Sequence, residues 1–203
     1  MSFFVSRAAA GAADRSQDRG DIFARGDAAV LAVADGAGGA GDGHRAADAL
    51  LERVRDATLD PAFDLLAPSR WQELFVSVDH ALHGVGETTA IVVVLAPGVV
   101  VCTASGDSEA WIVGRDVDAL TANVDRARLG SRGAKPSSMI GPELEGRLVV
   151  ASDGLFRHVP RERIVEVVRR ERFGAVADAL VACARLPSGG LHDDVVVLVA
   201  ERV

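Results

Sequence analysis

The feature that most constrains this chain is an apolar run that ends in one carboxylate and continues into glycine. Residues 31–34 read Leu-Ala-Val-Ala, typical of a strand covered on both faces, and Asp35 follows where that strand would reach the surface. Glycine dominates residues 36–43, and it lets the backbone turn sharply and approach a bound group closely. An ordinary turn, a phosphate-binding turn and a metal site with Asp35 and a glycine carbonyl as ligands are the three interpretations of this stretch.

The residues around the glycines disfavour the phosphate-binding turn. The nucleotide-binding fingerprints require a Lys followed by Ser or Thr, or the remainder of a Rossmann unit, after a glycine-rich turn. The sequence after residue 43 contains neither. A nucleotide-binding protein is therefore the weakest of the three readings, and the turn and the metal site stay open.

Hydrophobic periodicity divides the rest of the chain between helices and strands. Apolar residues at three- and four-residue spacing predict helices over residues 43–57, 69–82, 161–172 and 174–185. Alternating or β-branched runs predict strands over residues 3–6, 21–24, 88–96, 99–104, 110–114, 147–152 and 194–200. Turn formers between the three central strands predict an antiparallel meander, and residues 123–145 are expected to form a long surface loop, which is usually functional at this length.

Composition restricts the class of protein. A chain of 203 residues is long enough for one domain with a large core. Its 22 Lys and Arg against 29 Asp and Glu give a formal charge of −7, which argues against a nucleic-acid partner. Cys102 and Cys183 lie in apolar surroundings, as free thiols in a reducing compartment would. No leader and no apolar run of transmembrane length is evident, so the sequence predicts a soluble, cytoplasmic protein with no membrane partner.

Aspartate recurs where predicted strands begin or end. Asp35 and Asp153 each follow an apolar run and precede a glycine, and Asp193 and Asp194 introduce the last strand. A single case would be turn chemistry, whereas repetition in an apolar frame indicates a site for a hard cation. Oxygen ligands suit Mg²⁺ or Mn²⁺, and Cys and His are poorly placed for zinc.

The order of these motifs resembles the metal-dependent protein phosphatases of type 2C, a family that dephosphorylates phosphoserine and phosphothreonine. Each motif is weak alone, and the resemblance rests on their succession over residues 16–199. The motifs are SQD at 16–18, DGAGG at 35–39, GETTA at 86–90, ASGDS at 104–108, ASDGL at 151–155 and DDV at 193–195.

The resemblance implies a fold and a function. The fold is α+β, an α-β-β-α sandwich of two mainly antiparallel sheets flanked by helix pairs, with residues 1–203 as a single catalytic domain. The function is hydrolysis of phosphoserine and phosphothreonine in proteins, in a bacterial member that opposes a Ser/Thr kinase. The alternative is a catalytically weak pseudophosphatase that binds a phosphoprotein or a partner kinase.

The resemblance also implies a metal centre of two Mn²⁺ or Mg²⁺ ions. Asp35 would bridge the ions, and the Gly36 carbonyl would bind the second ion, which Asp18 reaches directly or through water. Asp153 and Asp193 would complete the protein ligands of the first ion. A water activated by the metals would attack phosphorus, which makes Asp35, Asp153 and Asp193 the expected catalytic residues.

The chain departs from the family pattern at the phosphate contact. The family often has an arginine five residues before the aspartate of the first motif, and that position is Ala13. Arg15 or Arg19 could reach the same space and are the candidates for the substrate phosphate. The basic residues of the 123–145 loop are either a solvated face or a further contact for phosphate; they are Arg126, Arg128, Arg132 and Lys135.

Two further positions follow from the resemblance. The Gly-Asp-Ser aspartate, Asp107, lies where the family has a third, weaker metal, but the residue four after Asp153 is Arg157, a cation that would disfavour this site. Thr88 and Thr89 are expected to support the loop near the metals through their hydroxyls.

Overall fold

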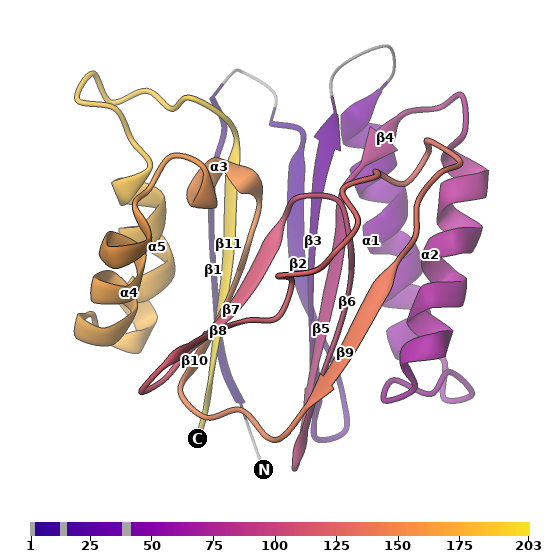
Figure 1. The fold of residues 1–203 in the computed structure, drawn as a ribbon, viewed down its shortest axis with the longest axis horizontal. Coiled ribbons are helices and arrows are strands. Elements are labelled where there is room, and N and C mark those ends of the chain that lie inside the picture. The colour runs from indigo at the N-terminus through magenta and orange to yellow at the C-terminus, as the bar shows by residue number, and fades with distance from the viewer. Residues whose placement is uncertain (1–2, 13–15, 38–41) are drawn as a thin grey trace.

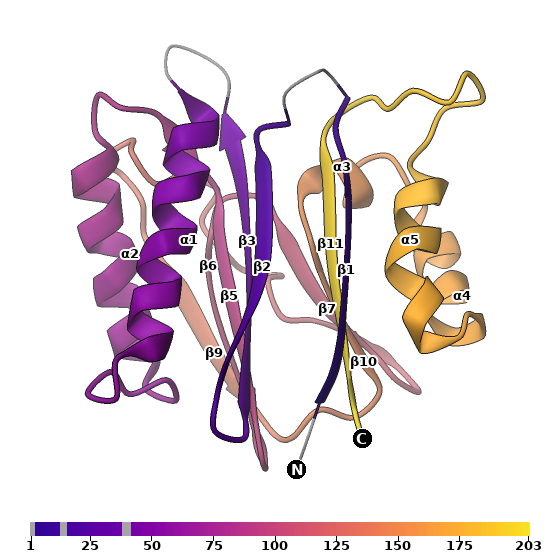
Figure 2. The same cartoon turned by 180° about the vertical axis from the view of Figure 1, so that it is seen from behind.

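Two antiparallel sheets lie face to face between two layers of helices in the computed structural model, which describes residues 3–12, 16–37 and 42–203 (Figures 1 and 2). One sheet has the strand order β1-β11-β10-β7-β8 and the other β2-β3-β5-β6-β9, with β4 paired to β3. Helices α1 and α2 cover the second sheet, and α4 and α5 cover the first (Figure 1). The expected α-β-β-α sandwich is confirmed.

The elements follow the predicted periodicities closely. The strands are β1 (Phe3–Ala10), β2 (Asp18–Arg25), β3 (Ala28–Ala37), β4 (Glu87–Thr88), β5 (Ala90–Ala96), β6 (Val99–Ser105), β7 (Glu109–Val113), β8 (Val117–Ala119), β9 (Ser137–Gly141), β10 (Arg147–Ala151) and β11 (Val195–Arg202). The helices are α1 (Gly43–Leu59), α2 (Pro68–Leu82), α3 (Asp153–Phe156), α4 (Arg161–Arg170) and α5 (Phe173–Cys183). Within the described residues, none of these helices has the length and apolar character needed to cross a membrane.

The central strands are apolar on both faces because each face meets a different layer. In β3, Val30 and Ala32 pack against α1 and α2, while Leu31 and Val33 point between the sheets. This alternation is the two-residue period of a strand. Asp35 continues the second series, so its carboxylate lies at the end of the layer between the sheets.

Residues of several sequence motifs meet at the open end of the layer between the sheets. In the β2–β3 register Asp18 lies directly opposite Asp35. The end of β3 and the start of α3 lie at the end of the sandwich remote from both chain termini (Figure 1). The strand that precedes α3, β10, is in the other sheet, so the two sheets contribute carboxylates to one space.

Two expectations about the strands are wrong. The predicted meander of three strands is broken, because β5 pairs with β6 whereas β7 crosses to the other sheet and pairs with β10 and β8. Gly106, with a φ of 100°, turns the chain at this crossing. The predicted loop of residues 123–145 contains β9, which takes the free edge of β6. Edge strands carry a weak periodicity, since one of their sides is solvated.

Gly154 sits at a close approach between two backbones. A Cβ at this position would lie 2.0 Å from the carbonyl oxygen of Asp194, at the start of the last strand. Contacts below 3.0 Å require the backbone to move. The glycine after Asp153 therefore allows α3 to start against the segment that carries Asp193 and Asp194.

Replacing Gly154 by alanine should lower the free energy of unfolding by about 2 kcal/mol because the clash is with backbone, which cannot rotate away. The melting temperature should fall by about 4–8 °C in a thermal scan. Gly174→Ala is the matched control. It lies in α5 with nothing within 4 Å of the added Cβ and should be neutral or slightly stabilising. Equal melting temperatures for the two variants would contradict the close approach of Gly154 to the carbonyl oxygen of Asp194.

Candidate metal centre

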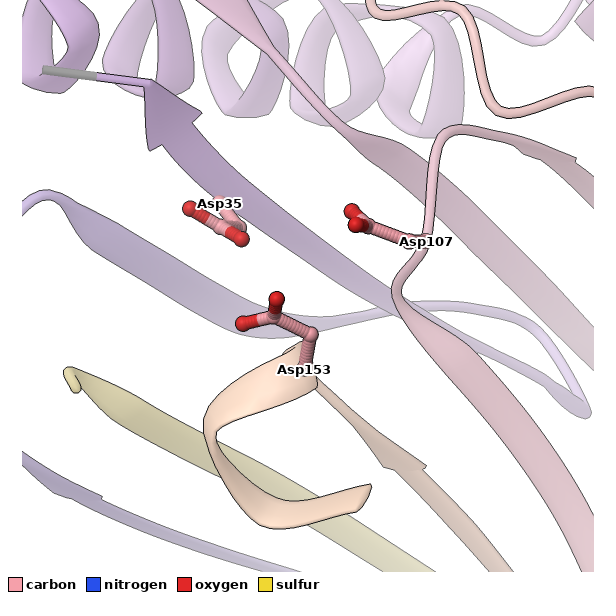
Figure 3. A group of neighbouring side chains, drawn as sticks. All are labelled: Asp35, Asp107 and Asp153. Atoms are coloured by element: carbon pink, nitrogen blue, oxygen red, sulfur yellow. The ribbon is translucent and has the colours of Figure 1, made fainter. Parts of the chain in front are cut away.

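Three carboxylates converge where the two sheets open. One oxygen each from Asp35, Asp107 and Asp153 lies within 4.8 Å of the other two (Figure 3). They come from the end of β3, the turn after β6 and the first residue of α3. The structure thus brings together two of the aspartates that the sequence singled out and adds Asp107, whose role the sequence left open.

Asp18, on the strand next to Asp35, is a further carboxylate of this acidic group. Its side chain is buried, and its Oδ2 has no hydrogen-bond partner among the described residues. Burial, followed by the charge of Asp35, raises the pKa of Asp18 to about 8. Burial, followed by the charge of Asp153, raises the pKa of Asp35 to about 6. Carboxylates crowded in this way lack positive charge, and a divalent cation would supply it.

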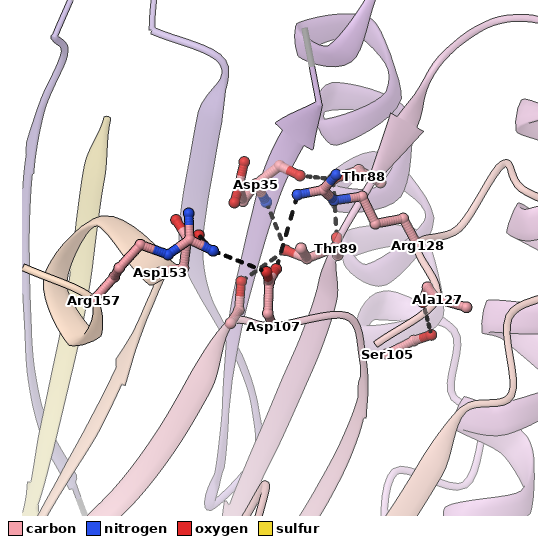
Figure 4. A network of polar contacts seen from close by, with 10 residues as sticks. Asp35, Thr88, Thr89, Ser105, Asp107, Ala127, Arg128, Asp153 and Arg157 are labelled. Atoms are coloured by element: carbon pink, nitrogen blue, oxygen red, sulfur yellow. Dashed lines mark hydrogen bonds and ion pairs between the residues drawn. The ribbon is translucent and has the colours of Figure 1, made fainter. Parts of the chain in front are cut away.

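Two guanidinium groups partly balance these carboxylates (Figure 4). Arg157 places Nη2 2.7 Å from Asp153 Oδ2 and 3.4 Å from Asp107 Oδ2. An Nη2 of Arg128 lies 4.0 Å from Asp107 Oδ1. Burial raises the pKa of Asp153, and the charge of Arg157 opposes that rise. The expectation that Arg157 weakens a third metal site near Asp107 stays a prediction.

Hydrogen bonds from the β4–β5 segment hold the backbone of Asp35. The Asp35 N–H donates to Thr89 Oγ1 at 2.9 Å, and the Thr89 N–H donates to the Asp35 carbonyl at 2.8 Å. Thr88 Oγ1 donates to the same carbonyl at 3.1 Å, and Thr89 Oγ1 also bonds Ser108 Oγ at 2.7 Å. The supporting role expected for the two threonines is confirmed. This network ties Asp35 to the turn that carries Asp107.

Gly36 is a glycine because of the packing around it. A Cβ there would lie 2.3 Å from the carbonyl oxygen of Gly43, the first residue of α1. The close backbone approach is present, and the ligand role of the Gly36 carbonyl stays a prediction. Residues 38–41, which follow in the same glycine-rich stretch, lie outside the described residues.

The two aspartates of the last motif, Asp193 and Asp194, have different surroundings. The Asp194 carboxylate accepts hydrogen bonds from the Ala12 N–H at 2.8 Å and the Gln17 N–H at 2.6 Å, so it holds the segment that leads to Asp18. Asp193 is exposed, and its Oδ1 accepts a bond from the Asp194 N–H at 2.9 Å. Asp193 lines the hollow with the buried carboxylates but is outside the group of three. Its ligand role stays a prediction.

The carboxylates line an open hollow of about 620 Å³. Its walls include the arginines Arg128 and Arg157 as well as Asp18, Asp35, Asp153 and Asp193. The sequence named Arg128 only as one of four basic residues of the 123–145 loop, because no pattern in that segment separates it from the other three.

Of the two arginines expected to contact phosphate, Arg15 and Arg19, the structure describes only Arg19. Arg19 Nε lies 2.5 Å from Asp48 Oδ1, and its Nη1 donates to the carbonyls of Ser16 and Asp18 at 2.8 and 2.9 Å. These bonds brace the start of β2, and Arg19 does not line the hollow. Its role toward phosphate stays a prediction. Ala13 and Arg15 lie outside the described residues.

No protein-family model and no curated protein sequence matches the chain, whereas solved structures do. The serine/threonine phosphatase of S. agalactiae matches with a TM-score of 0.86 and 18% identity over 99% of this chain and 100% of that one. Stp1 from Staphylococcus aureus matches at 0.84 and 16% over 99% and 94%. The catalytic domain of PstP, in complex with two manganese ions, matches at 0.81 and 20% over 98% and 97%. The chain has the fold of these bacterial phosphatases.

Asp18→Asn should stabilise the metal-free protein. A carboxyl with a pKa of 3.8 when unfolded and about 8 when folded binds more protons in the folded state, so its contribution to stability falls as pH rises across that interval. The variant lacks this loss. Its melting temperature in EDTA should exceed that of the wild type by a margin that grows from pH 4 to pH 8.

The control is Asp21→Asn, on the same strand but half exposed beside Arg7. It removes a carboxylate of the same strand without removing a buried charge, so it should not raise the melting temperature. If the difference in melting temperature between Asp18→Asn and the wild type stayed constant or became smaller as pH rises, the raised pKa of Asp18 would be contradicted.

Proposed function

We propose that this chain, which has the fold of bacterial serine/threonine phosphatases, is a metal-dependent phosphatase that hydrolyses phosphoserine and phosphothreonine in proteins. The observation that carries the proposal is the convergence of carboxylates carried by segments of both sheets at one open hollow. A second observation is the order of the sequence motifs, which contain a carboxylate at each position where the resemblance implies a metal ligand. Residues 1–203 would form one catalytic domain.

The residues present fit two divalent cations. Asp35 would bridge them, with the Gly36 carbonyl and Asp18 toward one and Asp153 and Asp193 toward the other. The orphaned Oδ2 of buried Asp18 supports this assignment, because a buried carboxylate oxygen without a partner is costly unless a ligand binds it. The two manganese ions of the PstP catalytic domain support the choice of metal. Bound here, the cations would supply a hydroxide nucleophile at neutral pH and screen the phosphoryl oxygens.

The chain's own residues would prepare this chemistry. Thr88 and Thr89 fix the backbone of Asp35, so its carboxylate stays aimed into the hollow without reorganisation during the reaction. Asp194 holds the segment before Asp18 through two backbone N–H groups. Because these bonds join segments far apart in sequence, the carboxylates are positioned by the sandwich and not by a single loop.

Hydrolysis of p-nitrophenyl phosphate and of a phosphothreonine peptide should require Mn²⁺ or Mg²⁺. EDTA should abolish both activities and added Mn²⁺ should restore them. Activity that survives thorough chelation would contradict the two-metal proposal. Binding of the phosphopeptide without turnover at saturating Mn²⁺ would favour the pseudophosphatase alternative, for which the missing arginine at Ala13 is the one sequence feature.

Asp153→Asn and Asp193→Asn should each lower kcat by about 10²-fold or more, because the cation that activates water is lost or misplaced. Asp194→Asn should be milder, since an asparagine oxygen keeps one of the two hydrogen bonds to residues 12 and 17. The measurement is steady-state kinetics at saturating Mn²⁺ with the melting temperature of each variant as a folding control. A larger loss from Asp194→Asn than from Asp193→Asn would shift the assigned ligand by one residue.

A further inference from the structure

Two arginines from separate elements reach the wall of the candidate site. Arg128 belongs to the segment between β8 and β9, and Arg157 directly follows α3. Both line the hollow that contains Asp35 and Asp153. Figure 4 shows the two guanidinium groups on opposite sides of Asp107.

Asp107 lies between these two cations. Its Oδ2 is 3.4 Å from Arg157 and its Oδ1 is 4.0 Å from Arg128, and the Asp107 side chain is 19% exposed. One carboxylate is therefore shared by two guanidiniums, and its Oδ1 is buried without a hydrogen-bond partner among the described residues. Arg128 Nε is also buried without a hydrogen-bond partner among the described residues. The contacts of Arg128 and Arg157 with Asp107 and Asp153 involve only Nη2 of each arginine, whereas a guanidinium has five N–H donors that suit an anion with several oxygens.

The segment that carries Arg128 is clamped to the body of the protein. Leu129 is fully buried and exchanges two backbone hydrogen bonds with Thr88, at 3.0 and 2.9 Å. Asp79 Oδ1 accepts from the N–H groups of Gly130 and Arg132, at 2.7 and 3.0 Å. Arg128 is therefore anchored one residue away from a buried side chain that is bonded to the β4 segment beside Asp35. A donor held in this way loses little conformational entropy when an anion binds.

Arg157 is placed differently, since its shortest contact is to a proposed metal ligand. Its Nη2 lies 2.7 Å from Asp153 Oδ2, and its side chain is 54% exposed. A cation bound by Asp153 would compete with this ion pair. Arg157 would then keep Asp107 as its carboxylate partner and offer its remaining donors to the hollow.

We propose that Arg128 and Arg157 bind the phosphoryl group of the substrate, with Asp107 as the positioning residue for both. The inference rests on the proposed function and adds the phosphate contact that Ala13 cannot supply. Planar guanidinium forks match pairs of phosphoryl oxygens, and two forks from different walls fix the orientation of the group. Among the described residues, Arg19 is engaged by Asp48 and backbone carbonyls, which leaves Arg128 and Arg157 as the arginines at the hollow.

The test measures phosphate and metal binding separately from turnover. The dissociation constant of inorganic phosphate is measured by calorimetry on the Mg²⁺-loaded protein, and KM and kcat are measured with p-nitrophenyl phosphate. Mn²⁺ affinity is obtained by titration with detection of free Mn²⁺. Arg128→Ala and Arg157→Ala should each weaken phosphate binding and raise KM by about 10-fold. Arg157→Ala should also tighten Mn²⁺ binding by about 2–5-fold, because Asp153 loses its competing partner.

Asp107→Asn separates positioning from metal binding. If Asp107 positions the two arginines, the Asp107→Asn substitution should raise KM and the phosphate dissociation constant by about 3–10-fold. The affinity for Mn²⁺ should be almost unchanged. A loss of about 10-fold in Mn²⁺ affinity with KM unchanged would instead make Asp107 a metal ligand and overturn its assignment. Arg128→Lys and Arg157→Lys keep the charge without the fork and should fall between the wild type and the alanine variants.

The matched control is Arg132→Gln, which removes an exposed cation from the same segment and does not line the hollow. It should leave all three quantities unchanged. Arg15→Ala tests the N-terminal alternative. If the wild type is active and the Arg128 and Arg157 variants, folded by melting temperature, keep wild-type KM and phosphate affinity, the inference is overturned while the proposed function stands. If the wild type binds phosphate through these arginines but shows no metal-dependent turnover, the proposed function fails and the binding assignment stands.

Discussion

The repulsion between crowded carboxylates at the open end of the sandwich is the constraint on which the site depends. Asp18 and Asp35 lie directly opposite one another on paired strands, an arrangement of like charges that destabilises a sheet. Burial raises the pKa of both. The apolar layer between the sheets offsets this cost, since Leu31 and Val33 immediately before Asp35 are fully buried. The buried apolar core thus stabilises the fold, whereas the repulsion between carboxylates destabilises the end of the sandwich where a cation would bind.

Hydrogen bonds over long sequence separations keep the strained groups in place. Thr89 is bonded to Asp35 and to Ser108, and Asp194 is bonded to the backbone on both sides of the segment before Asp18. A preorganised polar network of this kind lowers the cost of holding charges together before a ligand arrives.

The local character of each element was predictable, because apolar runs and helical spacing report burial directly. The strand before Asp35, the helix from residue 43 and the strand before Asp153 appear where the pattern placed them. The partner of each strand was less predictable. Strand β7 joins the opposite sheet because Gly106 turns the chain across the sandwich, and β9 is an edge strand with little periodicity of its own. Pairing is a long-range property that a short window of sequence does not contain.

The sequence alone determined which carboxylates end buried strands, and therefore that Asp35 and Asp153 would be rigidly held at a surface. It also determined the layered fold, through the order of its motifs. Only the tertiary structure decided that Asp107 joins them, that Asp194 anchors backbone while Asp193 faces the hollow, and that Arg128 and Arg157 flank Asp107. The physical reason is that charges from distant segments act on one another through space. Their balance exists only once both sheets have packed.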